Sequence, residues 1–149
     1  MRLTSFTDYT LRTLTYLALR PDRLTTIADI ATAYDISGNH LMKVVHRLAL
    51  SGDVTTVRGQ HGGLRLGRPA ADINIGAVVR RTEPDMALVP CFAAAGRCVI
   101  HEHCVLQHAL AEALDAFLGV LDRYTLAELV APRSALANQL GLTVPQPVP

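Results

Sequence analysis

The amino-acid sequence contains no uninterrupted apolar run long enough to cross a bilayer, and its opening residues, MRLTSFTDYT, lack the apolar centre of a secretion signal. Both absences argue against a membrane protein and predict a cytoplasmic one. The chain also has only three cysteines among its 149 residues. Because an odd set of three makes a poor disulfide framework in a reducing compartment, metal binding or thiol chemistry is the expected role of these thiols.

The usual signatures of an enzyme are missing as well. The stretch RGQHGG, residues 58–63, is rich in glycine, but no Gly-Lys-Ser/Thr follows it, so it is not a phosphate-binding loop. We find no nucleophile with a recognisable base and no cofactor-binding fingerprint. The sequence therefore predicts a protein that is not an enzyme.

Composition and charge suit a small globular protein with an anionic partner. Half of the residues are hydrophobic and 18% are charged, and 149 residues suit one compact domain with an appended element. Residues 1–80 hold ten Lys and Arg against six Asp and Glu, whereas residues 81–149 hold four against seven. This asymmetry favours contact between the front half and an anion.

Three helices are expected in the first fifty residues. Ser5 with Asp8 and Thr26 with Asp29 are typical of capping boxes, and Ser37 marks a third start. The third helix has apolar residues at positions i, i+3, i+4 and i+7, namely Leu41, Val44, Val45 and Leu48. The second and third helices, joined by a tight turn, predict a helix-turn-helix unit.

A β-hairpin is expected next. Gly52 ends the third helix, VTTVR and LRLG alternate as strands do, and RGQHGG is the long loop between them. A helix-turn-helix followed by a hairpin is a winged helix. Arg58 and His61 in an exposed wing could reach DNA phosphates or the minor groove, and we favour that role over a simple turn. Residues 72–82 predict a strand that leads into a helix, with Ile73 and Ile75 alternating.

The last long helix carries a periodic apolar seam. Its members step by four and three residues along one face: Leu106, Leu110, Ala113, Phe117, Val120 and Tyr124. Such a seam can pack on its own domain or on a second copy. Because a winged helix already has a core, we expect a symmetric homodimer. The fold class is thus mainly α, with a winged-helix DNA-binding domain and a long C-terminal dimerisation helix.

Three stretches together resemble the NsrR-type nitric-oxide-sensing repressors, part of a superfamily of winged-helix regulators that includes the iron–sulfur regulator IscR. These stretches are LTSFTDYTLR, NHLMKVVHRLALSGDVTTVRGQHGGLRLG and the spaced cysteines of CFAAAGRCVIHEHC. The resemblance covers residues 1 to about 130 and implies a homodimeric repressor of a DNA operator that responds to nitric oxide. It implies that Cys91, Cys98 and Cys104 hold an iron–sulfur cluster, with a 4Fe–4S type ahead of a 2Fe–2S type.

The resemblance also suggests the fourth ligand. In some NsrR proteins a carboxylate from the partner subunit's first helix serves, and the matching residue is Asp8, with Arg12 one turn on to hold it. The alternative for Asp8 is helix capping. His101 or His103 could replace Asp8, or could complete a zinc site, although the cysteine spacings are wide for structural zinc. The IscR branch has a histidine where this chain has Gln107, which argues against that ligation.

The resemblance places Asn39, His40 and Lys43 in the DNA-reading helix, with Lys43 toward phosphate, and Arg58, His61 and Gly62 in the wing. Relatives carry arginine at the position of Gly38, so one contact is missing. The expected parts of the chain are a winged helix (1–82), a cluster loop (83–104), a dimerisation region (105–131) and a tail (132–149). The rival functions are a sensor of iron–sulfur supply or redox state, and a zinc-stabilised DNA-binding protein.

Overall fold

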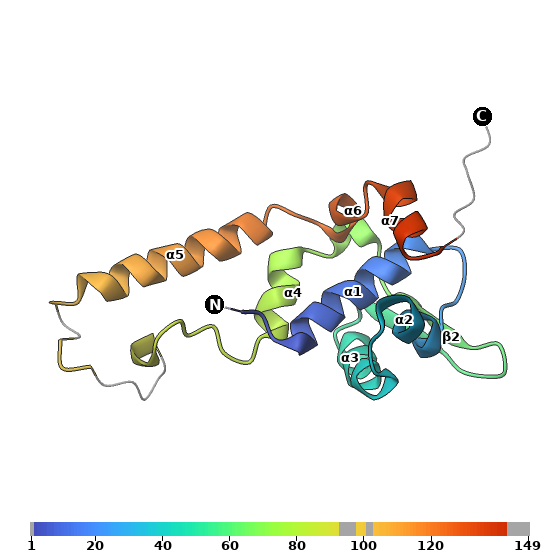
Figure 1. The fold of residues 1–149 in the computed structure, drawn as a ribbon, viewed down its shortest axis with the longest axis horizontal. Coiled ribbons are helices and arrows are strands. Elements are labelled where there is room, and N and C mark those ends of the chain that lie inside the picture. The colour runs from blue at the N-terminus through green and yellow to red at the C-terminus, as the bar shows by residue number, and fades with distance from the viewer. Residues whose placement is uncertain (1, 93–97, 101–102, 143–149) are drawn as a thin grey trace.

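The structure is a computed structural model that describes residues 2–92, 98–100 and 103–142. It is mainly helical with one two-stranded antiparallel sheet, as the sequence predicts (Figure 1). The order of elements is α1 (Ser5–Leu19), α2 (Ile27–Tyr34), α3 (Gly38–Leu50), β1 (Val54–Val57), β2 (Gly63–Leu66), a 3₁₀ turn (Ala70–Asp72), α4 (Ile75–Thr82), a second 3₁₀ turn (Pro90–Phe92), α5 (Val105–Leu121), α6 (Leu126–Leu129) and α7 (Arg133–Gln139). None of the helices in the described ranges is long and apolar enough to span a membrane.

The helix-turn-helix unit forms as expected. The Thr26 hydroxyl accepts from the Asp29 amide at 3.1 Å, and the Asp29 carboxylate accepts from the Thr26 amide at 2.8 Å. That backbone hydrogen bond from Thr26 holds the pKa of Asp29 below its ordinary value. Asp35 takes a left-handed conformation with φ of 52° at the end of α2, which turns the chain toward α3. The four predicted apolar residues of α3 are all buried, so its opposite face is left to solvent.

The N-cap residue of α1 lies one position earlier than the sequence predicts. Thr4, and not Ser5, is the N-cap residue, and its hydroxyl accepts from the Thr7 amide at 3.3 Å. The Thr4 amide in turn donates to Glu83 Oε1 at 2.8 Å, which ties the start of α1 to the end of α4. The capping box of Ser5 and Asp8 is therefore wrong. A carboxylate 79 residues away takes the role assigned to Asp8, and sequence spacing cannot reveal such a partner.

The wing is a short hairpin in which Val54 pairs with Leu66 and Val57 with Gly63. Its loop contains a close turn, since the Gly62 amide donates to the Gly59 carbonyl at 3.0 Å. A Cβ atom at Gly62 would lie 2.2 Å from the Val57 carbonyl oxygen, so only glycine fits there. Edge bonds between Thr25 and Leu64 attach the hairpin to the segment before α2.

The base of the wing rests on Asp53, a buried carboxylate that the sequence did not single out. Its Oδ2 atom accepts from the Ser51 hydroxyl at 2.7 Å and pairs with Arg81 of α4. Its Oδ1 atom lies 3.1 Å from Nη2 of Arg68, just beyond β2. Buried charge requires such partners, and here they join α3, the hairpin and α4. The sequence signal that could have identified Asp53 is its position directly after Gly52, which ends the third helix.

Residues 72–82 differ from the prediction. Ile73 and Ile75 are buried, but the chain passes from a 3₁₀ turn into α4 at Ile75 and forms no strand. The only sheet-like bonding there is an isolated bridge between Asn74 and Thr125, within the described part of the chain. The alternation therefore reflects one residue before the helix and one inside it, both facing the core. Two apolar residues are too few to distinguish these cases.

Helix α5, together with residues 83–92 and 98–100 before it, forms an arm that projects away from the winged helix, whereas α6 and α7 return to it (Figure 1). Leu126, Val130 and Ala137 are buried in the main core, and Arg133 donates to the Leu19 carbonyl at 2.9 Å. Residues 133–139, assigned to the tail by sequence, are thus a helix packed on α1. Residues 143–149 lie outside the described residues.

An ion pair with two hydrogen bonds holds the carboxyl end of α5. Nη1 and Nη2 of Arg80 donate to the two carboxylate oxygens of Asp122 at 2.5 and 2.7 Å. The hydrogen bonds from Arg80 lower the pKa of Asp122, and the same contact raises that of Arg80. A Cβ atom at Gly76 would lie 2.0 Å from Asp122 Oδ1, so glycine allows this close approach. The ion pair therefore anchors the carboxyl end of α5 to α4.

Candidate DNA interface and cysteine segment

The polar residues predicted to read DNA share the exposed side of α3. Asn39, His40 and Lys43 are all exposed, and they lie within the first two turns of the helix. The buried residues of the same helix face α1 and α2, so the fold presents the polar side outward. The amino-terminal turns of a recognition helix are the part that reaches base edges in a major groove.

One of these residues, His40, contacts an aromatic side chain of α1. The His40 ring stacks on Tyr9 of α1, with ring centroids 6.1 Å apart and planes at 27°. A small cavity of about 210 Å³ beside the two rings is lined by residues of α1 and α3, including Lys43. Sequence reasoning missed Tyr9, because the pairing joins two helices and leaves no local pattern. The stack places His40 against α1 and links α3 to the helix that carries Asp8.

The wing residues lie as the sequence predicts. Arg58 and His61 are exposed in the loop between β1 and β2. Gly62 is half-buried, and it has a structural role in shaping the loop because the Val57 carbonyl leaves no room for a Cβ atom there. The wing can therefore offer two cationic or hydrogen-bonding side chains to a phosphate backbone.

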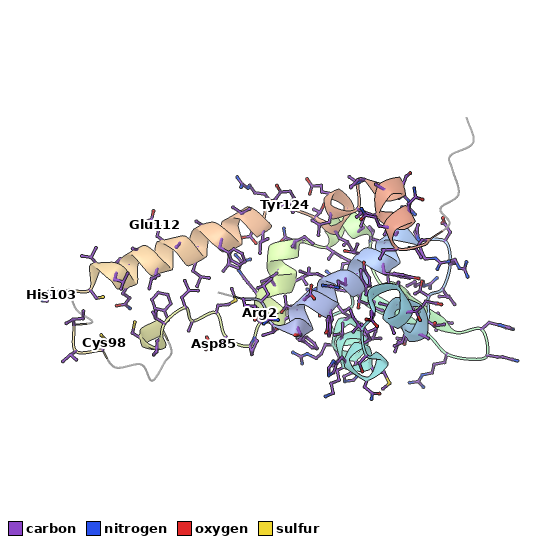
Figure 2. All side chains as sticks on the ribbon, in the orientation of Figure 1. Arg2, Asp85, Cys98, His103, Glu112 and Tyr124 are labelled. Carbon is purple, nitrogen blue, oxygen red and sulfur yellow. The ribbon has the colours of Figure 1, made fainter. Side chains whose placement is uncertain are left out.

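The three cysteines lie between α4 and the start of α5. Cys91 is in the 3₁₀ turn and half-buried, Cys98 is exposed, and Cys104 is the half-buried N-cap residue of α5. Figure 2 shows Cys98 and His103 at the distal end of this arm, far from the winged helix. All three thiols are free.

The cysteines suit a metal cluster by donor type but are not gathered. Within residues 2–92, 98–100 and 103–142, no three His, Cys, Asp or Glu side chains come together as a metal-binding group. Three free thiols on one segment are nevertheless the soft donors that an iron–sulfur cluster requires, and one thiol short of its usual four. His103 and His108 are exposed, and His101 lies outside the described residues. The donor set fits a cluster with one additional ligand.

Asp8 is held by Arg12 one turn along α1. Nε of Arg12 donates to Oδ1 at 3.0 Å and Nη2 lies 3.0 Å from Oδ2. The guanidinium also sits over the ring of Tyr34, 5.6 Å from its centroid. Asp8 thus has no capping role and presents a partly exposed carboxylate of fixed orientation.

The seam on α5 divides between two environments. Leu110 and Phe117 are half-buried against their own chain, whereas Leu106 and Val120 are 66% and 43% exposed. Tyr124 is also exposed but lies beyond the end of the helix at Leu121. The prediction of one continuous seam is therefore wrong in part, because Leu110 lies beside Met86 and Leu88 of the segment that precedes α5, and Tyr124 is not in the helix. Leu106, Ala113 and Val120 are the exposed members within the helix, and they define the outer strip of α5.

Known proteins resemble this chain over most of its length. A model of the Rrf2 family, described as iron-dependent transcriptional regulators, matches residues 3–132. The HTH-type transcriptional regulator NsrR of Bacillus subtilis strain 168 is 55% identical over 144 residues, which are 95% of this chain and 99% of that protein. The regulator of the same name from Geobacillus kaustophilus is 51% identical over 142 residues, with 94% and 97% covered. Among solved structures, oxidised CymR of Staphylococcus aureus has a TM-score of 0.72 and 25% identity, covering 88% of this chain and 97% of that one. The predicted resemblance to NsrR-type regulators is confirmed.

Proposed function

The chain belongs to the Rrf2 family of transcriptional regulators, and from this premise we propose a homodimeric repressor whose operator binding is controlled by an iron–sulfur cluster that reacts with nitric oxide. It is a regulator of transcription and not an enzyme. The observation that supports the proposal most is the presence, in one chain, of an outward polar face on α3 and three free thiols on a projecting arm. We place its action in the cytoplasm.

In the proposed complex, α3 enters the major groove and the wing contacts the neighbouring backbone. Asn39 and His40 meet base edges, and Lys43 pairs with a phosphate. Arg58 and His61 extend from the loop that Gly62 shapes. Because phosphate contacts carry most of the affinity, binding should weaken steeply as salt is raised.

The homodimer is proposed to form through the outer strip of α5. Leu106 and Val120 are large apolar side chains that the chain leaves in solvent. Burying them against a second copy would pair the two projecting arms. A symmetric contact of this kind also sets the spacing of the two α3 helices, and therefore the spacing of the operator half-sites.

Cys91, Cys98 and Cys104 are proposed to hold the cluster, with Asp8 of the partner subunit as the fourth ligand. When bound, such a cluster supplies iron that nitric oxide attacks. A carboxylate is a weak match for cluster iron, so the corner held by Asp8 is the one expected to exchange most easily. Arg12 orients this carboxylate, and the adjacent Tyr9 stacks on His40 of the reading helix.

The proposed control is a coupling between the arm and the reading helices. With the thiols and Asp8 engaged together, one relative position of the two α1 helices is favoured, and with it one position of each α3. Release of the ligands removes this bias. A coupling of about 1 to 3 kcal/mol would change operator affinity by roughly 5- to 150-fold, which suffices to switch a gene.

The test uses full-length protein purified without oxygen. Its absorption spectrum and iron content are measured, and nitric oxide is then titrated while binding to a selected operator duplex is followed. Operator affinity should fall in step with loss of the cluster absorption. The triple variant Cys91→Ser, Cys98→Ser, Cys104→Ser is the control without cluster ligands. Equal operator affinity of loaded and cluster-free protein would overturn the sensing proposal but leave the DNA-binding proposal intact.

A second candidate is a regulator of iron–sulfur supply, which the family's description as iron-dependent favours. Titrations with nitric oxide and with an iron chelator, run side by side, separate the two functions. Stoichiometric nitric oxide should lower the operator affinity of a nitric-oxide sensor, whereas a supply sensor should respond to removal of iron by the chelator and not to stoichiometric nitric oxide. Zinc found in place of iron would favour a zinc-stabilised DNA-binding protein instead.

A further inference from the structure

Met42 is a large apolar side chain on the DNA-facing side of α3. It is 52% exposed, although the neighbouring apolar residues Leu41 and Val44 are fully buried. A single exposed apolar residue needs no explanation by itself. Its place matters here, because it lies in the second turn of the helix that is proposed to enter the major groove.

The residues around Met42 define its surroundings. Asn39 lies three residues before it and His46 four residues after it, so all three share one side of the helix. Lys43 follows directly and is also exposed. Met42 is therefore the apolar element of an otherwise polar reading surface, one turn from a side chain suited to adenine.

The major groove offers one apolar group to a protein, the C5 methyl of thymine. Methionine is unbranched and polarisable, so it can extend to this methyl and adapt to its position. Asparagine is the side chain that pairs with adenine N6 and N7. The two residues, one turn apart, thus match an A·T-rich step on the floor of the groove.

We propose that Met42 contacts a thymine methyl group in each operator half-site and so sets a preference for thymine next to the base pair read by Asn39. This inference rests on the proposed binding of α3 in the major groove and adds one determinant of sequence specificity. Burial of one methyl group predicts a loss of about fourfold in affinity per half-site when the methyl is removed. Removal from both half-sites of a dimer should cost on the order of tenfold or more.

The test removes the methyl from the DNA and the thioether from the protein. A preferred duplex is first selected from random DNA with the full-length, anaerobically purified protein. Each thymine is then replaced in turn by deoxyuridine, which lacks only the C5 methyl. Affinities of the wild type, Met42→Ala, Met42→Leu and Leu50→Ala are measured on every duplex, and thermal unfolding checks that each variant is folded.

Leu50→Ala is the matched control, because Leu50 is 69% exposed on the same helix. It lies eight residues further along, about 12 Å from Met42 at 1.5 Å per residue, at the end directed away from the groove. The wild type and Leu50→Ala should lose affinity when deoxyuridine replaces the thymine that Met42 contacts, or the equivalent thymine of the other half-site. Met42→Ala should bind more weakly and show no loss there, whereas Met42→Leu should keep part of it.

The inference is overturned if the wild type tolerates deoxyuridine at every position, or if Met42→Ala retains the full wild-type sensitivity. Failure of the wild type to select any duplex would overturn the proposed function itself, together with this inference. The two failures are distinguished by the selection step.

Discussion

The guanidinium of Arg12 contacts both oxygens of the Asp8 carboxylate, with distances of 3.0 Å from Nε to Oδ1 and 3.0 Å from Nη2 to Oδ2. Both side chains are more than 40% exposed, so the pair adds little to stability, on the order of 0.3 to 0.5 kcal/mol. Its main effect is on orientation, since a carboxylate held at two points has few rotamers left. Arg12 can therefore position Asp8 while contributing little to stability.

Arg12→Ala should therefore leave the unfolding temperature nearly unchanged but shorten the lifetime of the bound cluster. Loss of a partner that orients a ligand typically costs about 10- to 100-fold in metal affinity. Decay of the cluster absorption in anaerobic buffer measures the effect, and Arg12→Lys, which keeps the charge without the two-point contact, should be intermediate. Wild-type decay in Arg12→Ala would rule out the positioning role.

Gly62→Ala should impair DNA binding through the shape of the wing. The added Cβ would meet the Val57 carbonyl oxygen at 2.2 Å, so the loop must shift and carry Arg58 and His61 with it. We expect weaker operator binding and a salt dependence reduced by about one phosphate contact. Gly119→Ala is the control, because nothing lies within 4 Å of its added Cβ, and it should raise stability by about 0.5 to 1 kcal/mol. An unchanged salt slope in Gly62→Ala would contradict the prediction.

The elements that the sequence predicted correctly are those with local signals. The Thr26–Asp29 capping box, the buried positions of α3 and the glycine-bounded hairpin each depend on residues a few positions apart. Two of the errors arise where a distant partner decides the outcome. Glu83 accepts the hydrogen bond that the capping prediction assigned to Asp8, and the segment before α5 lies beside Leu110 of the apolar seam.

In the candidate site, too, the features with local sequence signals could be predicted and those that depend on distant residues could not. Exposure of Asn39, Lys43 and Arg58 could be predicted, because a helix or hairpin with a periodic buried face must turn its other face outward. The stack of Tyr9 on His40 could not, since it depends on the distance between two helices. Nor does the described chain gather its three thiols, so the cluster assignment still depends on residue type and family resemblance.

Acid should weaken the joint between α4 and α5. Hydrogen bonds from Arg80 lower the pKa of Asp122 in the folded protein, so this contact favours folding above the ordinary carboxyl pKa of about 3.9. The contribution is lost as the pH falls through the lower folded value. Stability of the wild type should consequently decline more steeply below about pH 4 than that of Asp122→Asn, as measured by urea unfolding. Glu112→Gln, an exposed carboxylate of the same helix, controls for the loss of one negative charge.

Val120→Asp should weaken the proposed dimer without unfolding the protomer. Val120 is 43% exposed on the outer strip of α5, so a carboxylate there meets solvent in the monomer but would be buried unpaired in the dimer. Burial of an unpaired charge costs several kcal/mol, which shifts the dissociation constant by more than 100-fold. Gly119→Asp places the same charge on the neighbouring residue, which points about 100° away around the helix, and should leave the dimer intact. Sedimentation velocity over a range of concentrations distinguishes the two variants. If both sediment as the wild type does, the outer strip of α5 is not the interface, and the spacing of the α3 helices must be set by another surface.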